Sequence, residues 1–230
     1  MSAVPSLLNE RRTRLSSTDR RQQLLNHAIE LFSKRGFAGT RTKDIAAACG
    51  VSEGILFRHF ATKEDLYRAI LQSHADEAGA KEWMQEMQRH AAQRDDEALV
   101  HSLVTHIIRS FRDGAEFHRL LLYAWLEGHS LADMMQQQMG MPVCDFLKEY
   151  ISLRQREGVF RDGDPGTMVV ALFAPALQFG MSKYIFSAPW IQSDDEPAAE
   201  EFTRSLLAGI QRKAAEIPLS KKRNTPKSRS

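Results

Sequence analysis

Apolar residues recur every three or four positions along most of this 230-residue chain. One such series is Leu103, Ile107 and Phe111, which falls on a single stripe of a helix. Proline is sparse between residues 6 and 141, and runs of alternating β-branched residues, which would indicate strands, are absent. The pattern predicts an all-α protein of about eight to ten helices.

The composition excludes several classes of protein. Hydrophobic residues make up 43% of the chain and charged residues 26%, which is typical of a globular protein rather than a disordered one. The longest apolar run, Met168–Leu177, is interrupted by Pro175 and is shorter than the roughly 18–20 residues of a membrane span. The first thirty residues lack the apolar stretch of a signal peptide, and Cys49 and Cys144 are too few for a disulfide framework. We therefore expect a cytoplasmic protein without a membrane partner.

Charge is distributed unevenly along the chain. Residues 1–60 carry ten lysines and arginines against five acidic residues, and residues 61–216 carry sixteen against twenty-four. Residues 217–230 carry five basic residues and no acidic one, so the three segments have net charges of +5, −8 and +5. The asymmetry indicates a polyanionic partner for the basic N-terminal part, although unevenly spread solvated charge gives the same pattern.

Signals for helix ends divide the chain further. Asp19 suits the first turn of the first helix, Gly36 suits its end, and Thr62 with Asp65 forms a capping pattern for the fourth. Pro175 is expected to kink its helix or to remove a hydrogen bond from it. The expected helices are Thr18–Gly36, Thr42–Cys49, Ser52–Phe60, one that Thr62 opens, Gly79–Arg94, Asp95–Phe111, Ala115–Glu127, Pro142–Glu157, Asp164–Phe186 and Pro197–Glu216.

The segment Thr40–Leu66 carries the most informative pattern, TRTKDIAAACGVSEGILFRHFATKEDL. Two short helices flank Gly50, which permits a tight turn, and the small Ala46 lets the second helix cross the first closely. Apolar residues on both helices, such as Ile45 and Leu56, suit a shared core. A helix-turn-helix of this kind lays its second helix in the major groove of DNA.

These residues resemble the DNA-binding domain of the TetR (tetracycline-repressor-like) family of transcriptional regulators. The resemblance extends over residues 18–66, about a fifth of the chain at the level of motifs. It includes Ala28, Leu31, Phe32, Gly36, Phe37, Thr40, Thr42, Asp44, Ile45, Ala46, Gly50, Val51, Ser52, Gly54, Leu56, His59, Phe60, Lys63 and Leu66. The rest of the chain is similar in length, in helical character and in the Gly158–Asp164 turn before a long late helix.

The resemblance implies which residues contact DNA. They are Thr42 and Lys43 on the phosphate backbone, Glu53, Gly54 and Ile55 at base edges, Phe57 and Arg58 along the groove wall, and His59 and Lys63 on the backbone at the far side. Phe57 stands where the family usually has tyrosine, which puts one backbone contact in question. Arg58 is the sole cation inside the second helix of the motif, so guanine reading falls to Arg58 or to Lys43.

Several of these residues have an alternative structural interpretation. Glu53 either accepts from a cytosine amino group or serves only as a partner of the helix dipole. His59 is either a DNA contact, as the resemblance implies, or an ordinary solvated or packed side chain. Cys49 fits a small buried hydrophobe better than a redox sensor. The arginines of residues 11–14 are either a solvated tail or an arm that reaches the adjacent minor groove.

The resemblance further implies that the later helices form a dimer and hold a small molecule. Aromatic residues on the middle helices suit an apolar effector pocket, although aromatic residues at helical spacing are also typical of a core. The candidate pocket residues are Phe111, Phe117, Tyr123, Trp125, Phe173 and Phe179. The last two long helices would pair with their mates in a four-helix bundle. The candidate dimer interface is the stripe of Phe202, Leu206 and Ile210.

The expected organisation has four parts. Residues 1–17 form a flexible basic arm, residues 18–70 a three-helix helix-turn-helix domain, residues 71–216 a larger helical effector-binding and dimerisation domain joined through helix four, and residues 217–230 a disordered basic tail. We expect a homodimeric repressor that a small apolar effector releases from a palindromic double-stranded DNA operator. The alternative is a DNA-binding factor of the same fold, architectural or connected with the cell cycle, without small-molecule control.

Enzyme signatures are not found in the sequence. There is no P-loop, dinucleotide-type glycine motif, Gly-x-Ser-x-Gly elbow or His-Glu-x-x-His pair. His101 and His106 would lie roughly 140° apart around a helix, which suits no shared metal. The turn at residues 162–166 resembles part of a calcium loop but lacks the closing glutamate. We expect no catalytic residue, metal or cofactor.

Overall fold

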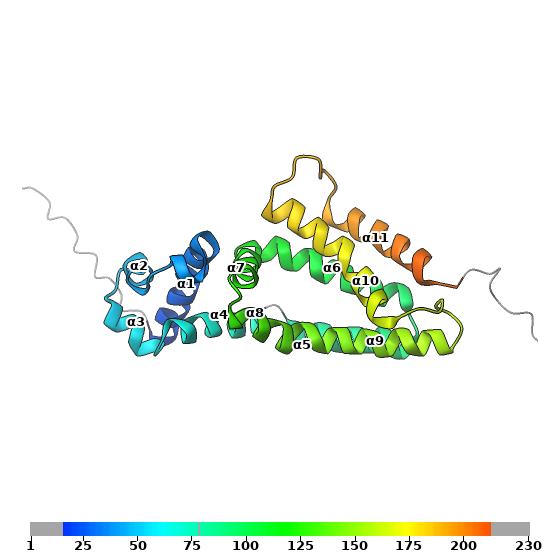
Figure 1. Ribbon diagram of the computed structural model, residues 1–230, viewed down its shortest axis with the longest axis horizontal. Coiled ribbons are helices and arrows are strands. Elements are labelled where there is room, and N and C mark those ends of the chain that lie inside the picture. Colours follow the sequence, from blue (N-terminus) through cyan, green and yellow to red (C-terminus); the bar gives the residue numbers. More distant parts are fainter. Residues whose placement is uncertain (1–15, 78, 213–230) are drawn as a thin grey trace, which may run out of the picture. The chain divides into compact units, whose positions relative to one another are not determined.

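The computed structural model describes residues 16–77 and 79–212, and these residues are largely helical (Figure 1). The chain forms two compact units. Unit 1 comprises the residues up to His74 together with Glu116–Ala132, and unit 2 comprises Ala75–Ala115 and the residues from Asp133 onward. The predicted all-α class is confirmed. The expected arm and tail, apart from residues 16 and 17, lie outside the described residues.

Unit 1 is built around the helix-turn-helix. Its elements are α1 (Ser17–Gly39), α2 (Thr42–Ala48), α3 (Glu53–His59), α4 (Lys63–Glu77), which continues into unit 2, and α7 (Ala115–Leu126). Ser16 caps α1 by accepting from the Asp19 N–H at 3.0 Å, and Gly36 interrupts the helix with φ 69° and ψ 176°. Both ends therefore lie close to the predicted ones. Apolar side chains such as Phe32 and Leu66 are fully buried in the unit's core.

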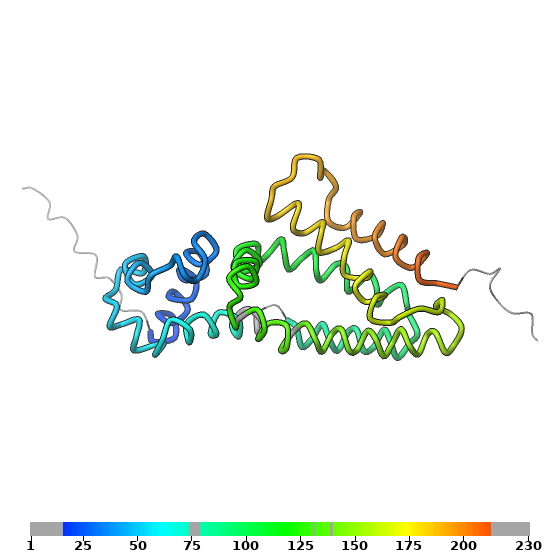
Figure 2. The backbone as a smooth tube through the Cα atoms, in the orientation of Figure 1, coloured from blue at the N-terminus to red at the C-terminus, as the bar shows by residue number. Residues whose placement is uncertain are grey.

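Unit 2 contains the remaining helices. They are α5 (Ala80–Gln93), α6 (Asp96–Asp113), the π-helical segment η1 (Gln136–Gly140), α9 (Met141–Arg156), α10 (Pro165–Gly180), the π-helical segment η2 (Met181–Ile185) and α11 (Asp195–Ile210), while α8 (Ser130–Met135) begins in unit 1. Figure 2 follows the chain from η1 into α9 and from α10 into η2 without a break in the helical path. The sequence analysis did not foresee α8 or η1.

The centre of unit 2 is α6, which packs against α5, α10 and α11. The stripe Leu103, Ile107 and Phe111 is buried there, as its spacing predicts. At Gly180 a Cβ atom would lie 2.4 Å from the Phe111 ring, so glycine lets α10 approach α6 closely. Pro175 lies inside α10, which continues through it.

The end of α11 differs from the expectation. The predicted helix ran to Glu216, whereas α11 ends at Ile210 and Gln211 is extended. The backbone of this segment pairs with residues 50 positions earlier, because the Arg161 N–H donates to the Ile210 carbonyl and the Arg212 N–H donates to the Val159 carbonyl. An antiparallel bridge between Phe160 and Gln211 thus takes the place of another helical turn.

One stretch, Pro165–Ile185, is long and apolar enough by length and composition to cross a membrane. The sequence analysis counted uninterrupted apolar residues and found a shorter run. The mean hydropathy of an 18-residue window stays high even where single polar residues interrupt the run. The stretch contributes buried residues such as Leu172 and Phe179 to the core of unit 2, as a core helix does.

Candidate nucleic-acid interface

The turn between α2 and α3 brings the two helices of the motif together. Gly50 has φ +66°, and the Val51 N–H donates to the Ala46 carbonyl at 3.0 Å. Ala46 and Leu56 are buried, which fixes α3 against the core of unit 1. The Arg21 guanidinium lies 4.7 Å from the centre of the Phe60 ring and covers the end of α3. The predicted helix-turn-helix is present with its boundaries within one residue.

The outward face of α3 is open to solvent. Glu53, Gly54, Phe57 and Arg58 are exposed, with 44% of Phe57 accessible, while Ile55 is half-buried. Four of the six predicted contacts on this helix can therefore reach a ligand freely, and the other two, Ile55 and His59, are half-buried. The half-buried Ile55 packs partly against the core and is partly accessible to solvent, as expected for an apolar residue at the edge of the exposed face of α3.

Glu53 has a partner that the sequence analysis did not foresee. The Thr42 hydroxyl donates to the Glu53 carboxylate, so the first residue of α2 is tied to the first residue of α3. The two residues were predicted as separate contacts, one to phosphate and one to bases. In the free protein the two side chains form a hydrogen-bonded pair, which links the N-terminus of α2 to the N-terminus of α3.

Exposed cations surround this face. Lys43 and Arg58 are exposed and make no hydrogen bond or ion pair with another described residue. Arg41, which precedes α2 and was not among the predicted contacts, is exposed in the same way. The sequence signal that could have identified Arg41 as a contact is its position next to Thr42, a predicted phosphate contact. Unpaired cations of this kind position a protein on phosphate groups.

Lys63 is engaged inside unit 1. Its ammonium donates to the Phe37 carbonyl and lies 4.1 Å from the centre of the Phe37 ring. Burial lowers the pKa of Lys63. The ammonium has three hydrogens, so its predicted phosphate contact is compatible with this bond but shares the side chain with it. His59 is half-buried at the end of α3, beside Phe60.

The segment Glu116–Ala132 belongs to unit 1 and contacts α1 and α4, although the predicted boundary at residue 70 places it in the larger domain. The Glu127 carboxylate accepts from the Phe37 N–H at 3.2 Å, and the Tyr67 hydroxyl donates to the Leu120 carbonyl at 3.3 Å. The His129 ring lies 4.2 Å from the Phe37 ring, centre to centre. Burial raises the pKa of Tyr67.

Gly36 makes this packing possible. A Cβ atom at Gly36 would lie 2.2 Å from a Glu127 carboxylate oxygen, and the positive φ is itself unfavourable for other residues. The glycine that ends the first part of α1 therefore also leaves room for the Glu127 carboxylate, which directly follows α7. This second role depends on a residue 91 positions away, which the sequence pattern does not reveal.

The six candidate pocket residues are divided between the two units. Phe117, Tyr123 and Trp125 belong to unit 1, where Phe117 is buried and Trp125 is 55% exposed. The others, Phe111, Phe173 and Phe179, belong to unit 2. Phe111 and Phe179 are buried in its core, which is the alternative that the sequence left open. None of the six lines any of three grooves found on the described part of the chain.

The candidate dimer stripe is largely inside unit 2. Ile210 is buried, and Phe202 and Leu206 are half-buried. Phe202 packs on Phe179 with ring centres 5.6 Å apart. Periodicity identified the apolar face of α11 correctly, but part of that face covers the same chain's core. Among residues 16–77 and 79–212, no group of histidine, cysteine or acidic residues suits a metal ion.

Comparison with known proteins identifies relatives of this arrangement. A family model described as bacterial regulatory proteins, tetR family, matches residues 24–70. The HTH-type transcriptional repressor Rv3405c of Mycobacterium tuberculosis is 32% identical over 193 residues, which cover 82% of this chain and 86% of the relative. The HTH-type transcriptional activator FasR of Mycolicibacterium smegmatis is 44% identical over 68 residues, covering 30% of this chain and 31% of the activator.

Solved structures share the fold over most of the chain. AibR in complex with isovaleryl coenzyme A and operator DNA has a TM-score of 0.62 at 22% identity, covering 82% of this chain and 98% of AibR. The ketosteroid transcriptional regulator KstR2 of Mycobacterium tuberculosis has a TM-score of 0.61 at 18% identity, covering 87% of this chain and 98% of KstR2. At these identities the likeness concerns the fold.

Proposed function

This chain belongs to the TetR family of bacterial transcriptional regulators, and we propose that it is a homodimeric repressor that leaves a palindromic operator when a small apolar effector binds. Its relatives are transcriptional regulators rather than enzymes. The observation that carries the proposal is the exposed face of α3 with the unpaired Arg58. A regulator of this kind would act in the bacterial cytoplasm.

The proposed DNA contacts divide into two classes. Lys43, with Arg41 beside it, and Lys63 would neutralise phosphates, which gives salt-dependent affinity without sequence preference. Arg58 and the exposed start of α3 at Glu53 and Gly54 would face base edges. On binding, the Thr42–Glu53 hydrogen bond would either persist and orient the hydroxyl or open to free both groups. His59 would contact the backbone from its half-buried position.

The proposed dimer interface is centred on α10. Val170 is 68% exposed and Leu177 40% exposed, and the small Ala174 lies exposed between them on the same helical stripe. An apolar stripe of this kind on a core helix suits a symmetric partner. The exposed Ala208 and Gly209 of α11 would allow a second helix to approach closely. Ile210, being buried, contributes to the support of this surface rather than to the contact itself.

The effector proposal is supported by relatives and by the chain's path. The structure of AibR includes isovaleryl coenzyme A, and KstR2 is called a ketosteroid regulator. In the present chain, α4 runs from unit 1 into unit 2, and Glu116–Ala132 leaves unit 2 to pack with α1 and α4. A ligand in unit 2 would therefore act on the recognition helix through two chain segments. A coupling of about 1–3 kcal/mol between ligand and DNA would suffice for release.

The alternative of a DNA-binding factor without small-molecule control is favoured by one observation. Two of the six predicted pocket aromatics, Phe111 and Phe179, are buried in the core of unit 2. An operator that lies beside a transport or catabolic gene would argue for an effector. Many scattered sites would argue for the architectural role.

The experiment that tests the proposal is genome-wide mapping of bound DNA, followed by binding of the top site with purified protein at physiological salt. We expect a palindrome with half-site centres about 34–36 Å apart or somewhat more, and loss of binding in Val170→Asp, which should be monomeric by light scattering. Wild-type protein that is monomeric on the bound site would contradict the dimer. A reporter that rises rather than falls with the intact gene would contradict repression.

A further inference from the structure

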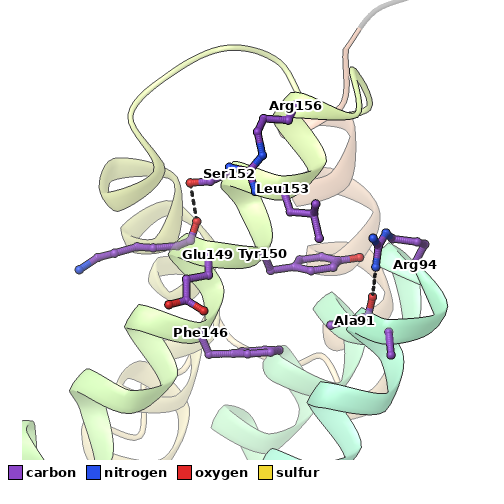
Figure 3. Close-up of a pocket in the computed structure, with 10 residues that line it drawn as sticks. Ala91, Arg94, Phe146, Glu149, Tyr150, Ser152, Leu153 and Arg156 are labelled. Atoms are coloured by element: carbon purple, nitrogen blue, oxygen red, sulfur yellow. Dashed lines mark hydrogen bonds between the residues drawn. The ribbon is translucent and has the colours of Figure 1, made fainter.

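We propose that a groove between α5 and α9 binds a small anionic amphiphile, meaning a molecule with an aryl or alkyl body and one carboxylate, sulfonate or phosphate end. The groove has a volume of about 610 Å³ and lies wholly in unit 2 (Figure 3). This volume is within the range of small-molecule sites. The site is distinct from the operator surface and from the six predicted pocket aromatics, so the inference goes beyond the proposed function.

One wall of the groove is apolar. Phe146, Tyr150 and Leu153 follow one another on the same face of α9, and Figure 3 shows both rings directed toward α5. On the other side Ala91 and Ala92 offer only methyl groups, which leaves room between the helices. Phe146 and Leu153 are half-buried, so part of their apolar surface meets water in the free protein. A ligand body that covers this surface would gain hydrophobic free energy.

The polar atom in this wall is already satisfied. The Tyr150 hydroxyl donates to the Asp96 carboxylate at 2.6 Å, away from the groove's apolar surface. The Tyr150 ring is therefore held in place, and it presents carbon atoms rather than an unpaired hydroxyl. A polar neutral ligand would find no unsatisfied partner on this wall, whereas an aryl or alkyl group fits it.

The lining of the groove carries three cations and one carboxylate, and Glu157 and Asp145 offset the charges of two of the cations. Arg94, Lys148 and Arg156 line the rim with one acidic residue, Glu149. Lys148 is paired with Asp145 at 3.3 Å, whereas Arg156 is exposed and pairs with no other described residue. The excess of cations is unusual for this part of the chain, because residues 61–216 carry a net charge of −8. A ligand that uses both wall and rim must combine an apolar body with an anionic end.

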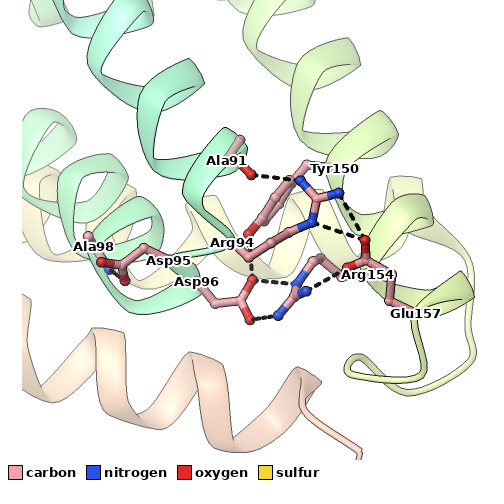
Figure 4. A network of polar contacts seen from close by, with 8 residues as sticks. All are labelled: Ala91, Arg94, Asp95, Asp96, Ala98, Tyr150, Arg154 and Glu157. Atoms are coloured by element: carbon pink, nitrogen blue, oxygen red, sulfur yellow. Dashed lines mark hydrogen bonds and ion pairs between the residues drawn. The ribbon is translucent and has the colours of Figure 1, made fainter.

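Arg94 is held rigidly at this rim (Figure 4). It has a left-handed backbone with φ 60°, which is costly for a residue other than glycine and persists only where surrounding contacts hold it. Its guanidinium donates to Glu157 at 3.0 Å and to the Ala91 carbonyl at 3.2 Å, and its Nη2 lies 2.9 Å from the same Glu157 oxygen in an ion pair. Glu157 is held in turn by Arg154, which pairs with the buried Asp96 at 2.7 Å.

This network leaves Arg94 able to bind more. A guanidinium has five N–H donors, and two of them make hydrogen bonds to Glu157 and Ala91, so others remain for a ligand. Glu157 balances its charge, so Arg94 supplies directed hydrogen bonds while Arg156 supplies the uncompensated charge. Arg94 is in place before a ligand arrives, which lowers the entropic cost of binding.

The test is a fluorescence titration of the full-length protein with 8-anilinonaphthalene-1-sulfonate, which has an aryl body and one sulfonate. We expect one saturable site per chain. Ala92→Trp should fill the groove and Arg156→Glu should reverse the rim charge, and each should weaken binding at least tenfold. The matched control is Arg204→Glu, a charge reversal at an exposed position of α11, which should leave the affinity unchanged.

Two further measurements separate the possible outcomes. The neutral analogue N-phenyl-1-naphthylamine should bind at least fivefold more weakly than the sulfonate, and decanoate should displace the sulfonate. Melting curves verify that the variants fold. Unchanged binding in both groove variants, or equal affinity for the neutral analogue, would overturn the proposal. No DNA enters these measurements, so failure of the proposed operator binding would leave their result intact.

Discussion

The helix-turn-helix and the centre of unit 2 use arginine in opposite ways. Around α3, Arg58 is exposed and has no partner among the described residues. In unit 2, Arg154 is 8% exposed, and its guanidinium makes two hydrogen bonds to Asp96, at 2.9 and 2.7 Å. The first arrangement leaves charge available for a ligand. In the second arrangement Asp96 neutralises the charge of Arg154 within the fold. Removing either partner would leave the other charge buried without compensation.

The comparison shows why composition alone is a poor guide to function. Arginine is exposed and unpaired in one unit, where we propose that it contacts DNA, and buried in an ion pair in the other, so only the surroundings distinguish the two. A substitution at Arg58 should therefore affect DNA binding and leave stability alone, and a substitution at Arg154 should do the reverse. The predictions below test how far this separation holds, beginning with the largest effect.

The first prediction concerns the buried ion pair. Arg154→Leu should destabilise the protein by about 3–5 kcal/mol, because it leaves the Asp96 carboxylate buried and uncompensated. Urea unfolding followed by circular dichroism measures the change. The double variant with Asp96→Leu should recover part of the loss, since it removes the second charge as well. A loss below about 1 kcal/mol in Arg154→Leu would mean that the pair is more solvated than its burial indicates.

The second prediction concerns the exposed arginine. Arg58→Leu should weaken operator binding by about 1–3 kcal/mol and relax the sequence preference at one base pair. Its unfolding free energy should stay within about 0.5 kcal/mol of wild type, as for other exposed substitutions. Fluorescence anisotropy on operator and on scrambled DNA measures both affinities. Equal losses on the two DNAs would show that Arg58 contacts phosphate rather than bases.

The third prediction concerns acid stability in unit 2. The His106 ring stacks flat on Trp83 with centres 3.9 Å apart, and burial and the nearby Arg109 lower the pKa of His106 to about 4. The unfolded chain binds the proton near pH 6.5, so folding favours the neutral ring. Stability from this group is present above pH 6.5 and is lost as the pH falls toward 4.

His106→Phe isolates this contribution, because it keeps an aromatic ring against Trp83 and removes the titration. Between pH 7 and pH 5 the wild type should lose about 2 kcal/mol more than the variant does. Urea midpoints at the two pH values measure the difference. Parallel losses in the two proteins would assign the acid sensitivity to other groups.

The fourth prediction concerns Lys63, which is bonded to Phe37 inside unit 1 and is also a proposed phosphate contact. Lys63→Ala should weaken binding to all DNA sequences by about 1 kcal/mol and reduce the salt slope by about one. Lys34→Ala, an exposed lysine of α1 that pairs with Glu30, is the matched control and should change neither. Affinities measured across a range of salt concentrations decide the matter. An unchanged salt slope would show that Lys63 contacts Phe37 but does not contact a phosphate of the DNA.

The smallest effect is expected at Phe57. Phe57→Tyr adds a hydroxyl at an exposed position of the recognition face and should tighten operator binding by about 0.5–1 kcal/mol through one new hydrogen bond. Phe186→Tyr makes the same change at a 64% exposed site in unit 2 and should have no effect on DNA binding. A weaker complex with Phe57→Tyr would indicate that the ring packs against an apolar group of the DNA.

Local signals in the sequence were sufficient to predict the helix-turn-helix. Ser52 and Thr62 mark helix starts, Gly50 marks the turn, and each acts on residues within a few positions. The fold class and the recognition face followed from these signals and from the family resemblance. The Thr42–Glu53 bond did not, because it requires the relative placement of two helices.

Long-range contacts were the main source of error. The packing of Glu116–Ala132 onto α1 and α4 depends on pairs such as Phe37 with Glu127, and periodicity describes only which face of a helix is apolar. The same limit applies to Ile210, whose apolar character was correct but whose partner lies in its own chain. The early end of α11 arises from pairing with residues 159–161. The helical periodicity used here does not distinguish a π-helical segment from an α-helix, so η1 and η2 were not predicted as such.

The contact between Gly36 and Glu127 bears on how the protein is made. A ribosome delivers residues in order, so the four N-terminal helices are complete long before the segment that packs on them has been synthesised. Until then the Phe37 N–H lacks its carboxylate acceptor. The end of α1 would thus acquire this hydrogen bond only after more than half of the chain has emerged.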